Sequence, residues 1–132
     1  MTHHSLPVRV YYEDTDVGGV VYYANYLRFI ERGRSDWLRD LGVDQTAMKR
    51  DGVVFVVRHL TADYLRSAHF EDMLCVDTDL VEIGGAKLIF DQRVLRGDDL
   101  LFTARVVVVC VGLATGAAVR IPPAVRDVLP VP

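Results

Sequence analysis

The residues best suited to chemistry form an acidic loop near the N-terminus. The run Glu13-Asp14-Thr15-Asp16 follows a strand-like pattern, Gly18-Gly19 comes next, and a helical pattern begins near Val20. Asp16 would then face the start of a helix, where backbone N–H groups lack partners and negative charge is favoured. A carboxylate beside such donors can act on a carbonyl group as a nucleophile or as a base. The same pattern also arises where an aspartate caps a helix or closes a turn.

Two periodic patterns flank this loop and would hold it in place. Apolar residues alternate with others from Leu6 to Tyr12, which predicts a strand. From Val20 to Leu41 apolar residues recur every three or four positions, which predicts a long amphipathic helix that ends at Gly42. Gly33 lies inside this helix, where glycine costs about 1 kcal/mol relative to alanine. We therefore expect that face of the helix to approach another backbone closely.

The chain beyond residue 52 has the pattern of consecutive strands joined by tight turns. The expected strands are 53–65, 73–83, 87–95, 100–111 and a short last one near 117–121, with room for a helical turn around 45–50. Gly84-Gly85 and Gly97-Asp98 suit tight turns, which require antiparallel neighbours. The single long helix must then cover one face of the sheet. We expect an α+β fold, a curved antiparallel sheet wrapped around one helix, as one domain over residues 1–132.

The composition excludes several classes of protein. The chain has 132 residues, of which 51% are apolar, so it can bury a core without disulfide bonds. Its formal net charge of −3 argues against a nucleic-acid partner. Cys75 and Cys110 lie in apolar runs and are expected to be buried free thiols, which fits a cytoplasmic protein. The first residues lack the regions of a secretory signal, and the apolar run 106–111 is too short to span a membrane.

The histidines give no sign of a metal site, and we expect no metal. His59 and His69 have no cysteine or acidic residue at metal-ligand spacing. His3 and His4 fall in a terminal segment that we expect to be disordered.

The acidic loop and the helix start resemble a known family. The run YYEDTDVGGVVYYANY, from Tyr11 to Tyr26, and the segment Glu31-Arg32-Gly33-Arg34 resemble the hotdog-fold acyl-CoA thioesterases. The resemblance is strongest to the 4-hydroxybenzoyl-CoA thioesterase type and its Tol–Pal-associated subgroup, and segment 63–72 is similar to the family's second strand and turn. The resemblance covers nearly the whole chain. It implies a hotdog fold, a homodimer or homotetramer with sites between subunits, and cofactor-independent hydrolysis of acyl-CoA thioesters.

The resemblance also implies roles for two residues. It makes Asp16 the catalytic carboxylate and the backbone N–H of Tyr23 the donor that polarises the thioester carbonyl. Many members of the subgroup have histidine where this chain has Tyr23, but a backbone role does not depend on that side chain. Whether Asp16 attacks the thioester or activates a water is left open. Asp14 is expected to serve a turn or a cap.

Substrate contacts are expected from residues on both sides of the helix start and from one hairpin. We expect Gly19, Val20 and Tyr26 to contact the substrate, although tyrosines at helical spacing more often belong to a core or a subunit interface. Coenzyme A is polyanionic, and Lys87, beside Gly84-Gly85, is the first candidate for its phosphates, because relatives hold the nucleotide near this hairpin. The other basic candidates are Arg58, Arg93 and Arg120.

Two alternative functions share this fold. A hotdog hydratase or dehydratase would use a histidine with an acidic partner, and the segment around Asp16 contains no histidine. A non-catalytic module that binds acyl-CoA or acyl carrier protein needs neither group, since a fold does not determine a function. The sequence does not distinguish short aliphatic from aromatic acyl groups.

Overall fold

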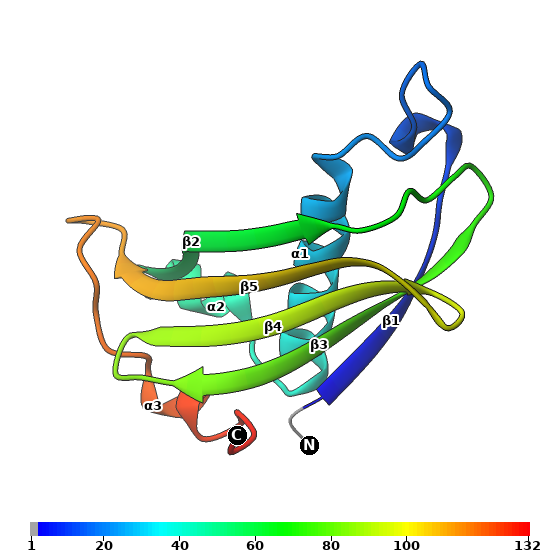
Figure 1. Cartoon of the computed structure of the whole chain (residues 1–132). Helices are drawn as coiled ribbons and strands as arrows, with labels where there is room; N and C mark the ends of the chain where they lie inside the picture. The colour runs from blue at the N-terminus through cyan, green and yellow to red at the C-terminus, as the bar shows by residue number, and fades with distance from the viewer. Residues whose placement is uncertain (1–2) are drawn as a thin grey trace.

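Four of the strands expected beyond residue 52 form one antiparallel sheet with the N-terminal strand. The computed structural model describes residues 3–132 (Figure 1). Its strands are β1 (His3–Arg9), β2 (Val53–Tyr64), β3 (Met73–Ile83), β4 (Lys87–Arg96) and β5 (Asp99–Gly112). They lie in the order β1-β3-β4-β5-β2, and every neighbouring pair is antiparallel. Strands β2 and β1 are therefore the two edges of the sheet.

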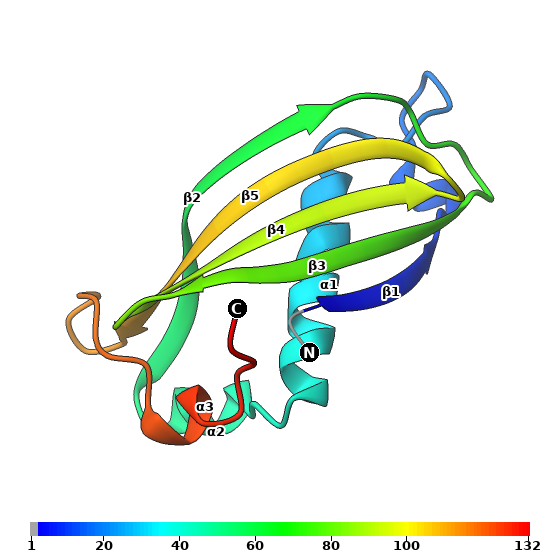
Figure 2. The same ribbon diagram turned by 60° about the horizontal axis from the view of Figure 1, so that its bottom comes forward.

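One long helix covers the inner face of this sheet. The helices are α1 (Asn25–Asp40), α2 (Gln45–Arg50) and α3 (Pro123–Arg126), and a 3₁₀ turn, η1 (Tyr12–Asp14), precedes α1. The sheet curves over α1, which contacts β1, β3 and β4 (Figure 2). The apolar stripe of α1 is buried there, including Phe29, Ile30 and Trp37. The expectation of a curved antiparallel sheet around one helix is confirmed.

Gly33 marks the place where α1 comes closest to the sheet. A Cβ atom at this position would lie 2.7 Å from Cγ1 of Val76 and 3.0 Å from Oγ1 of Thr78. The expectation of a close approach is confirmed, but the nearest neighbours are side chains of β3 and not a backbone. The absence of a side chain at Gly33 therefore sets the distance between helix and sheet.

We expect Gly33→Val to lower the free energy of unfolding by about 1–3 kcal/mol, because the added atoms would overpack this contact. Urea denaturation followed by circular dichroism measures the change. Arg32→Val is the control. It places the same β-branched residue at an exposed position of the same helix, where it cannot overpack the contact with β3. Equal stability of Gly33→Val and Arg32→Val would contradict the expectation.

Several boundaries differ from those expected from the sequence. The helix begins at Asn25 and not near Val20, because Val20 pairs with His69 and Val21 with Thr15 in short bridges. The expectation of a short strand near 117–121 is wrong. That segment makes a single bridge to β5, and Pro123 begins α3, where a proline without an N–H is well tolerated.

The N-terminal histidines are ordered, which corrects the expectation of disorder. Strand β1 begins at His3, and His3 and His4 pair with Asp79 and Thr78 of β3. Pairing with a strand far along the chain supplies the order that the local sequence does not.

Two further expectations concern the thiols and the membrane. Cys75 and Cys110 are free, and Cys110 is buried while Cys75 is half-buried. Burial raises the pKa of the Cys110 thiol. Across residues 3–132, no helix combines the length and the apolar character that crossing a bilayer requires.

Candidate active site

The acidic loop folds into a small turn that fixes Asp16. The N–H of Asp16 donates to the carbonyl of Val20 at 2.9 Å, and the N–H of Gly19 donates back to the carbonyl of Asp16 at 3.0 Å. Gly19 has φ +80°, a conformation that favours glycine. One carboxylate oxygen of Asp16 accepts from the N–H of Gly18 at 2.9 Å. The side chain is exposed, and within residues 3–132 its second oxygen accepts no hydrogen bond, so it can approach a ligand.

Asp14 has the structural role expected of it. It ends the 3₁₀ turn η1, and its carboxylate accepts from the N–H of Tyr11 at 2.8 Å. Its carbonyl accepts from the N–H of Tyr22 at 2.9 Å and from the side-chain amide of Asn25 at 2.8 Å. Asn25 is buried and begins α1, so these bonds attach the acidic loop to the start of the helix.

Tyr23 presents its backbone N–H just before the helix and not within it. In the described part of the chain, this N–H donates to no protein acceptor. The carbonyl of the same residue accepts from the hydroxyl of Tyr64 at 2.9 Å, which holds this part of the backbone in place. A fixed, unpaired N–H can polarise a carbonyl group or stabilise an oxyanion.

Four of the expected site residues line one groove. Asp16, Val20, Tyr23 and Tyr26 surround an open hollow of about 330 Å³. Gly19 lies at the adjoining turn and does not line it. The groove thus brings together the two residues that carry a free carboxylate oxygen and an unpaired N–H.

Tyr26 forms the floor of this groove and also belongs to the core. It is buried and stacks on Phe102 with ring centroids 5.1 Å apart. Its hydroxyl accepts from the N–H of Ala68 at 3.0 Å. Burial raises the pKa of Tyr26, so the phenol stays neutral. The core role considered from the sequence is correct for this tyrosine.

The opposite wall of the groove was missed by the sequence analysis. It is lined by residues 64–67, the last residue of β2 and the three that follow it, although segment 63–72 was identified only as a family motif. Tyr64 alternates with Ala62 and Leu60 along β2, and this period was the available signal that its ring packs against Tyr26 and Phe102. The approach of this wall to the acidic loop depends on tertiary packing and has no local signal.

A salt bridge secures the turn behind this wall. Arg96 donates to a carboxylate oxygen of Asp72 at 2.8 Å and to the carbonyl of Ser67 at 3.2 Å. Burial alone would raise the pKa of Asp72, but the hydrogen bonds from Arg96 and from the N–H of His69 outweigh it and lower that pKa. Nδ1 of His69 lies 3.8 Å from a carboxylate oxygen of Asp72. This histidine therefore has an acidic neighbour, which was not expected from its position in the sequence.

Lys87 does not join this groove within one chain. It begins β4 at the hairpin with β3, at the end of the sheet opposite the acidic loop (Figure 1). Its ammonium group lies 3.1 Å from a carboxylate oxygen of Glu82. Contact between Lys87 and coenzyme A stays a prediction.

Comparisons with known proteins identify the family of the chain. Residues 10–129 match the model of the thioesterase-like superfamily. The chain is similar to the acyl-CoA thioesterase YbgC of Haemophilus influenzae, with 46% identity over 123 residues that cover 92% of this chain and 90% of that protein. It is also similar to the acyl-CoA thioester hydrolase YbgC of Escherichia coli, with 47% identity over 106 residues that cover 80% of this chain and 79% of the relative.

Solved structures give the same result. A probable thioesterase from Bartonella henselae superposes with a TM-score of 0.85 at 38% identity, covering 91% of this chain and 99% of that one. The DHNA-CoA thioesterase of Staphylococcus aureus superposes with a TM-score of 0.90 at 21% identity, covering 97% and 89%, and at that identity it supports the fold alone. The chain therefore has the hotdog fold and belongs to the thioesterase-like superfamily.

Proposed function

We propose that residues 1–132 act as one hotdog domain that hydrolyses acyl-CoA thioesters, of short aliphatic or aromatic acids, to the free acid and CoA. The observation that carries the proposal is the groove lined by both Asp16, which has a free carboxylate oxygen, and Tyr23, which has an unpaired N–H. The names of the YbgC relatives, an acyl-CoA thioesterase and an acyl-CoA thioester hydrolase at 46% and 47% identity, support the same chemistry.

The proposed mechanism needs only these two groups and water. The N–H of Tyr23 donates to the thioester carbonyl oxygen and stabilises the negative charge that develops there. Asp16 then follows one of two routes. It attacks the carbonyl carbon, expels the CoA thiolate and forms an anhydride that water hydrolyses, or it removes a proton from a water that attacks directly. Each route consumes one water and releases one acid and one CoA.

We propose that the active form is a homodimer or homotetramer in which the β2 edge contributes to the subunit interface. An unpaired edge strand offers free N–H and carbonyl groups to another chain. Val56 and Val57 of this strand are 41% and 50% exposed, which is unfavourable for apolar side chains in water. Light scattering during gel filtration measures the mass, and the mass of a single chain would contradict the proposal.

The substrate carrier is a separate part of the proposal. We propose that Lys87 contacts the CoA phosphates of a substrate bound across the subunit interface, because the groove of its own chain lies at the other end of the sheet. Acyl carrier protein is the alternative carrier of the same thioester. Comparing thiol release from one acyl group on each carrier distinguishes them.

A thiol-release assay across a panel of acyl-CoAs tests the proposed function. We expect continuous release of free thiol from at least one aliphatic or aromatic acyl-CoA. Tight binding of acyl-CoA without thiol release over hours would contradict hydrolysis and support a binding module. Loss of the ultraviolet absorbance of an enoyl-CoA without thiol release would instead support a hydratase.

Tyr64→Phe is expected to lower kcat about 5-fold, the effect of one hydrogen bond of about 1 kcal/mol. The change removes the hydroxyl that holds the carbonyl of Tyr23 at 2.9 Å, so the adjoining peptide is less well placed. Steady-state kinetics measures kcat, and urea denaturation checks that stability changes little. Tyr12→Phe, at a highly exposed tyrosine, is the control. Equal kcat for the two variants would show that this bond does not position the site.

A further inference from the structure

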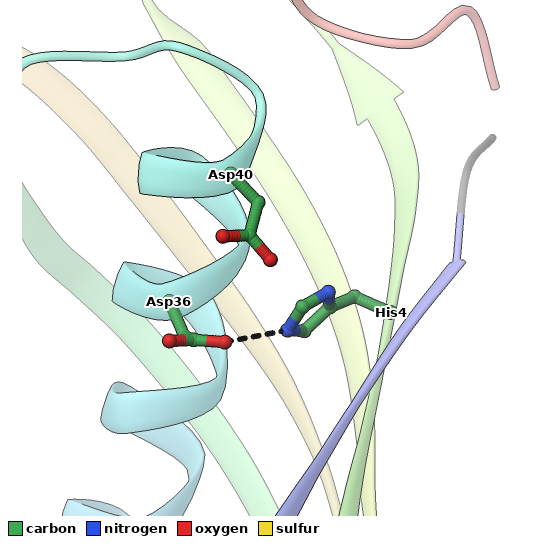
Figure 3. Close-up of side chains that lie close together, drawn as sticks. All are labelled: His4, Asp36 and Asp40. Atoms are coloured by element: carbon green, nitrogen blue, oxygen red, sulfur yellow. Dashed lines mark hydrogen bonds and ion pairs between the residues drawn. The ribbon is translucent and has the colours of Figure 1, made fainter.

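A second group of side chains lies far from the groove, where β1 crosses α1. His4 of β1 faces Asp36 and Asp40 of α1 (Figure 3). One potential ligand atom from each of the three residues lies within 4.8 Å of the other two. The Nε2 atom of His4 is 3.0 Å from a carboxylate oxygen of Asp36. None of these residues takes part in the proposed reaction.

The fold holds these side chains in place. His4 is paired with Thr78 of β3, and its ring stacks on Trp37 with a centroid distance of 6.0 Å and an interplanar angle of 10°. Its side chain is only 14% exposed. Asp36 and Asp40 are four residues apart on α1, so they lie one turn apart on the same face. The three groups therefore come from two packed elements and need little ordering to meet.

The two carboxylates are placed unfavourably unless a cation is nearby. Asp40 is the last residue of α1, where the helix dipole disfavours negative charge, and like charges four residues apart, as at Asp36 and Asp40, repel each other. Asp36 shares a hydrogen bond of 3.0 Å with Nε2 of His4, and its ion pair with Arg39, whose side chain is 77% exposed, spans 3.8 Å. Such an exposed pair contributes little. A bound cation would remove this repulsion.

We propose that His4, Asp36 and Asp40 bind a divalent transition-metal ion, with Zn²⁺ as the preferred ion and water in the remaining positions. One imidazole and two carboxylates suit Zn²⁺ and Co²⁺, whereas Ca²⁺ and Mg²⁺ prefer oxygen ligands alone. Ligands about 2.0–2.2 Å from a shared tetrahedral Zn²⁺ ion lie roughly 3.3–3.6 Å from each other, and the hydrogen-bonded atoms of His4 and Asp36, 3.0 Å apart, need to separate only slightly to reach this spacing. A rotation of the Asp40 side chain would have to bring its carboxylate, which lies within 4.8 Å of the other two ligand atoms, to the same spacing.

The proposed ion would have a structural effect and would not enter the proposed reaction. Helix α1 has 16 residues, so at 1.5 Å per residue its two ends lie about 24 Å apart. The acidic loop adjoins the first residue of α1, whereas Asp40 is the last residue of α1. The ion would hold β1 against the end of α1 and stabilise the fold.

Titration of the tag-free chain with Zn²⁺ tests the proposal. We expect isothermal titration calorimetry to show one ion bound per chain. At a hundredfold excess over Kd, we expect Tm to rise by about 5 °C or more. Co²⁺ is expected to quench the fluorescence of Trp37, the single tryptophan of the chain, because the His4 ring stacks on it. Ca²⁺ should produce neither change.

Three variants locate the site. Asp40→Asn alters an exposed side chain and, like His4→Gln, is expected to weaken Zn²⁺ binding at least tenfold, because losing even an outer-shell partner of a ligand costs about 10–100-fold. His3→Gln is the matched control, because His3 bonds instead to Asp79 at 2.9 Å, and this variant should bind Zn²⁺ normally. Circular dichroism confirms folding. Zn²⁺ binding that is absent in the wild type, unchanged in Asp40→Asn, or lost in His3→Gln would overturn the proposal, whatever the rate of thiol release.

Discussion

Asp16→Asn is expected to lower kcat for thiol release by about 10²–10⁴-fold, the usual contribution of a positioned acid–base group. The variant keeps the size of the side chain, and an amide oxygen can still accept from the N–H of Gly18, so the loop should keep its shape. Binding of acyl-CoA, measured by calorimetry, should change little. Steady-state kinetics with the best acyl-CoA of the panel measures the loss.

Asp14→Asn is the matched control for this loss. Its carboxylate lies in the same loop but accepts a hydrogen bond from the N–H of Tyr11. We expect its kcat to stay within a few-fold of the wild-type value, because an amide oxygen can replace that acceptor. An Asp16→Asn protein with wild-type turnover, or an equal loss in Asp14→Asn, would contradict the assignment of Asp16.

Gln92→Leu is expected to lower the free energy of unfolding by about 3 kcal/mol, the upper range for a lost hydrogen bond to a charged group. Gln92 belongs to β4 and is 1% exposed, and its side chain lies between the sheet and α1. Its amide oxygen accepts from Arg34 at 2.8 Å, and its nitrogen donates to the carbonyl of Ile30 and to Oγ1 of Thr78, each at 2.8 Å. Burial lowers the pKa of Arg34, because the charged form is poorly solvated there. Leucine would leave this guanidinium without its acceptor.

A second substitution tests whether the loss of stability comes from leaving Arg34 without its acceptor. Replacing both partners of a buried bond by apolar groups costs less than removing one. We therefore expect the double variant Arg34→Met with Gln92→Leu to be more stable than Gln92→Leu alone. Urea denaturation of the two single variants and the double variant gives the coupling. Strictly additive losses would show that Arg34 and Gln92 do not act as a pair.

The sequence predicted the strands well where local chemistry determines them. Strand β3 has the expected bounds 73–83, and β4 and β5 differ by a residue or two. Alternating apolar residues and the glycine turns at Gly84-Gly85 and Gly97 carry this information locally. The start of α1 was predicted too early because Val20 and Val21 continue the apolar period, while the bridge from Val20 to the distant His69 leaves no local trace.

The candidate site was predicted in part for the same reason. Asp16 and Tyr23 came from the resemblance, and the groove brings both together with Val20 and Tyr26. The wall at residues 64–67 comes from a segment more than 35 residues away along the chain and could not be read from the loop itself. Likewise, His4 is ordered only because β1 pairs with β3.

A crystal structure of the Asp16→Asn protein with a bound acyl-CoA tests the central claim most directly. The account predicts that the thioester lies in the groove, with its carbonyl oxygen within about 3.1 Å of the Tyr23 nitrogen, as an oxyanion donor requires. It also predicts that the side chain at position 16 lies beside the carbonyl carbon or beside a water that can attack it. A thioester bound out of reach of both groups would contradict the account.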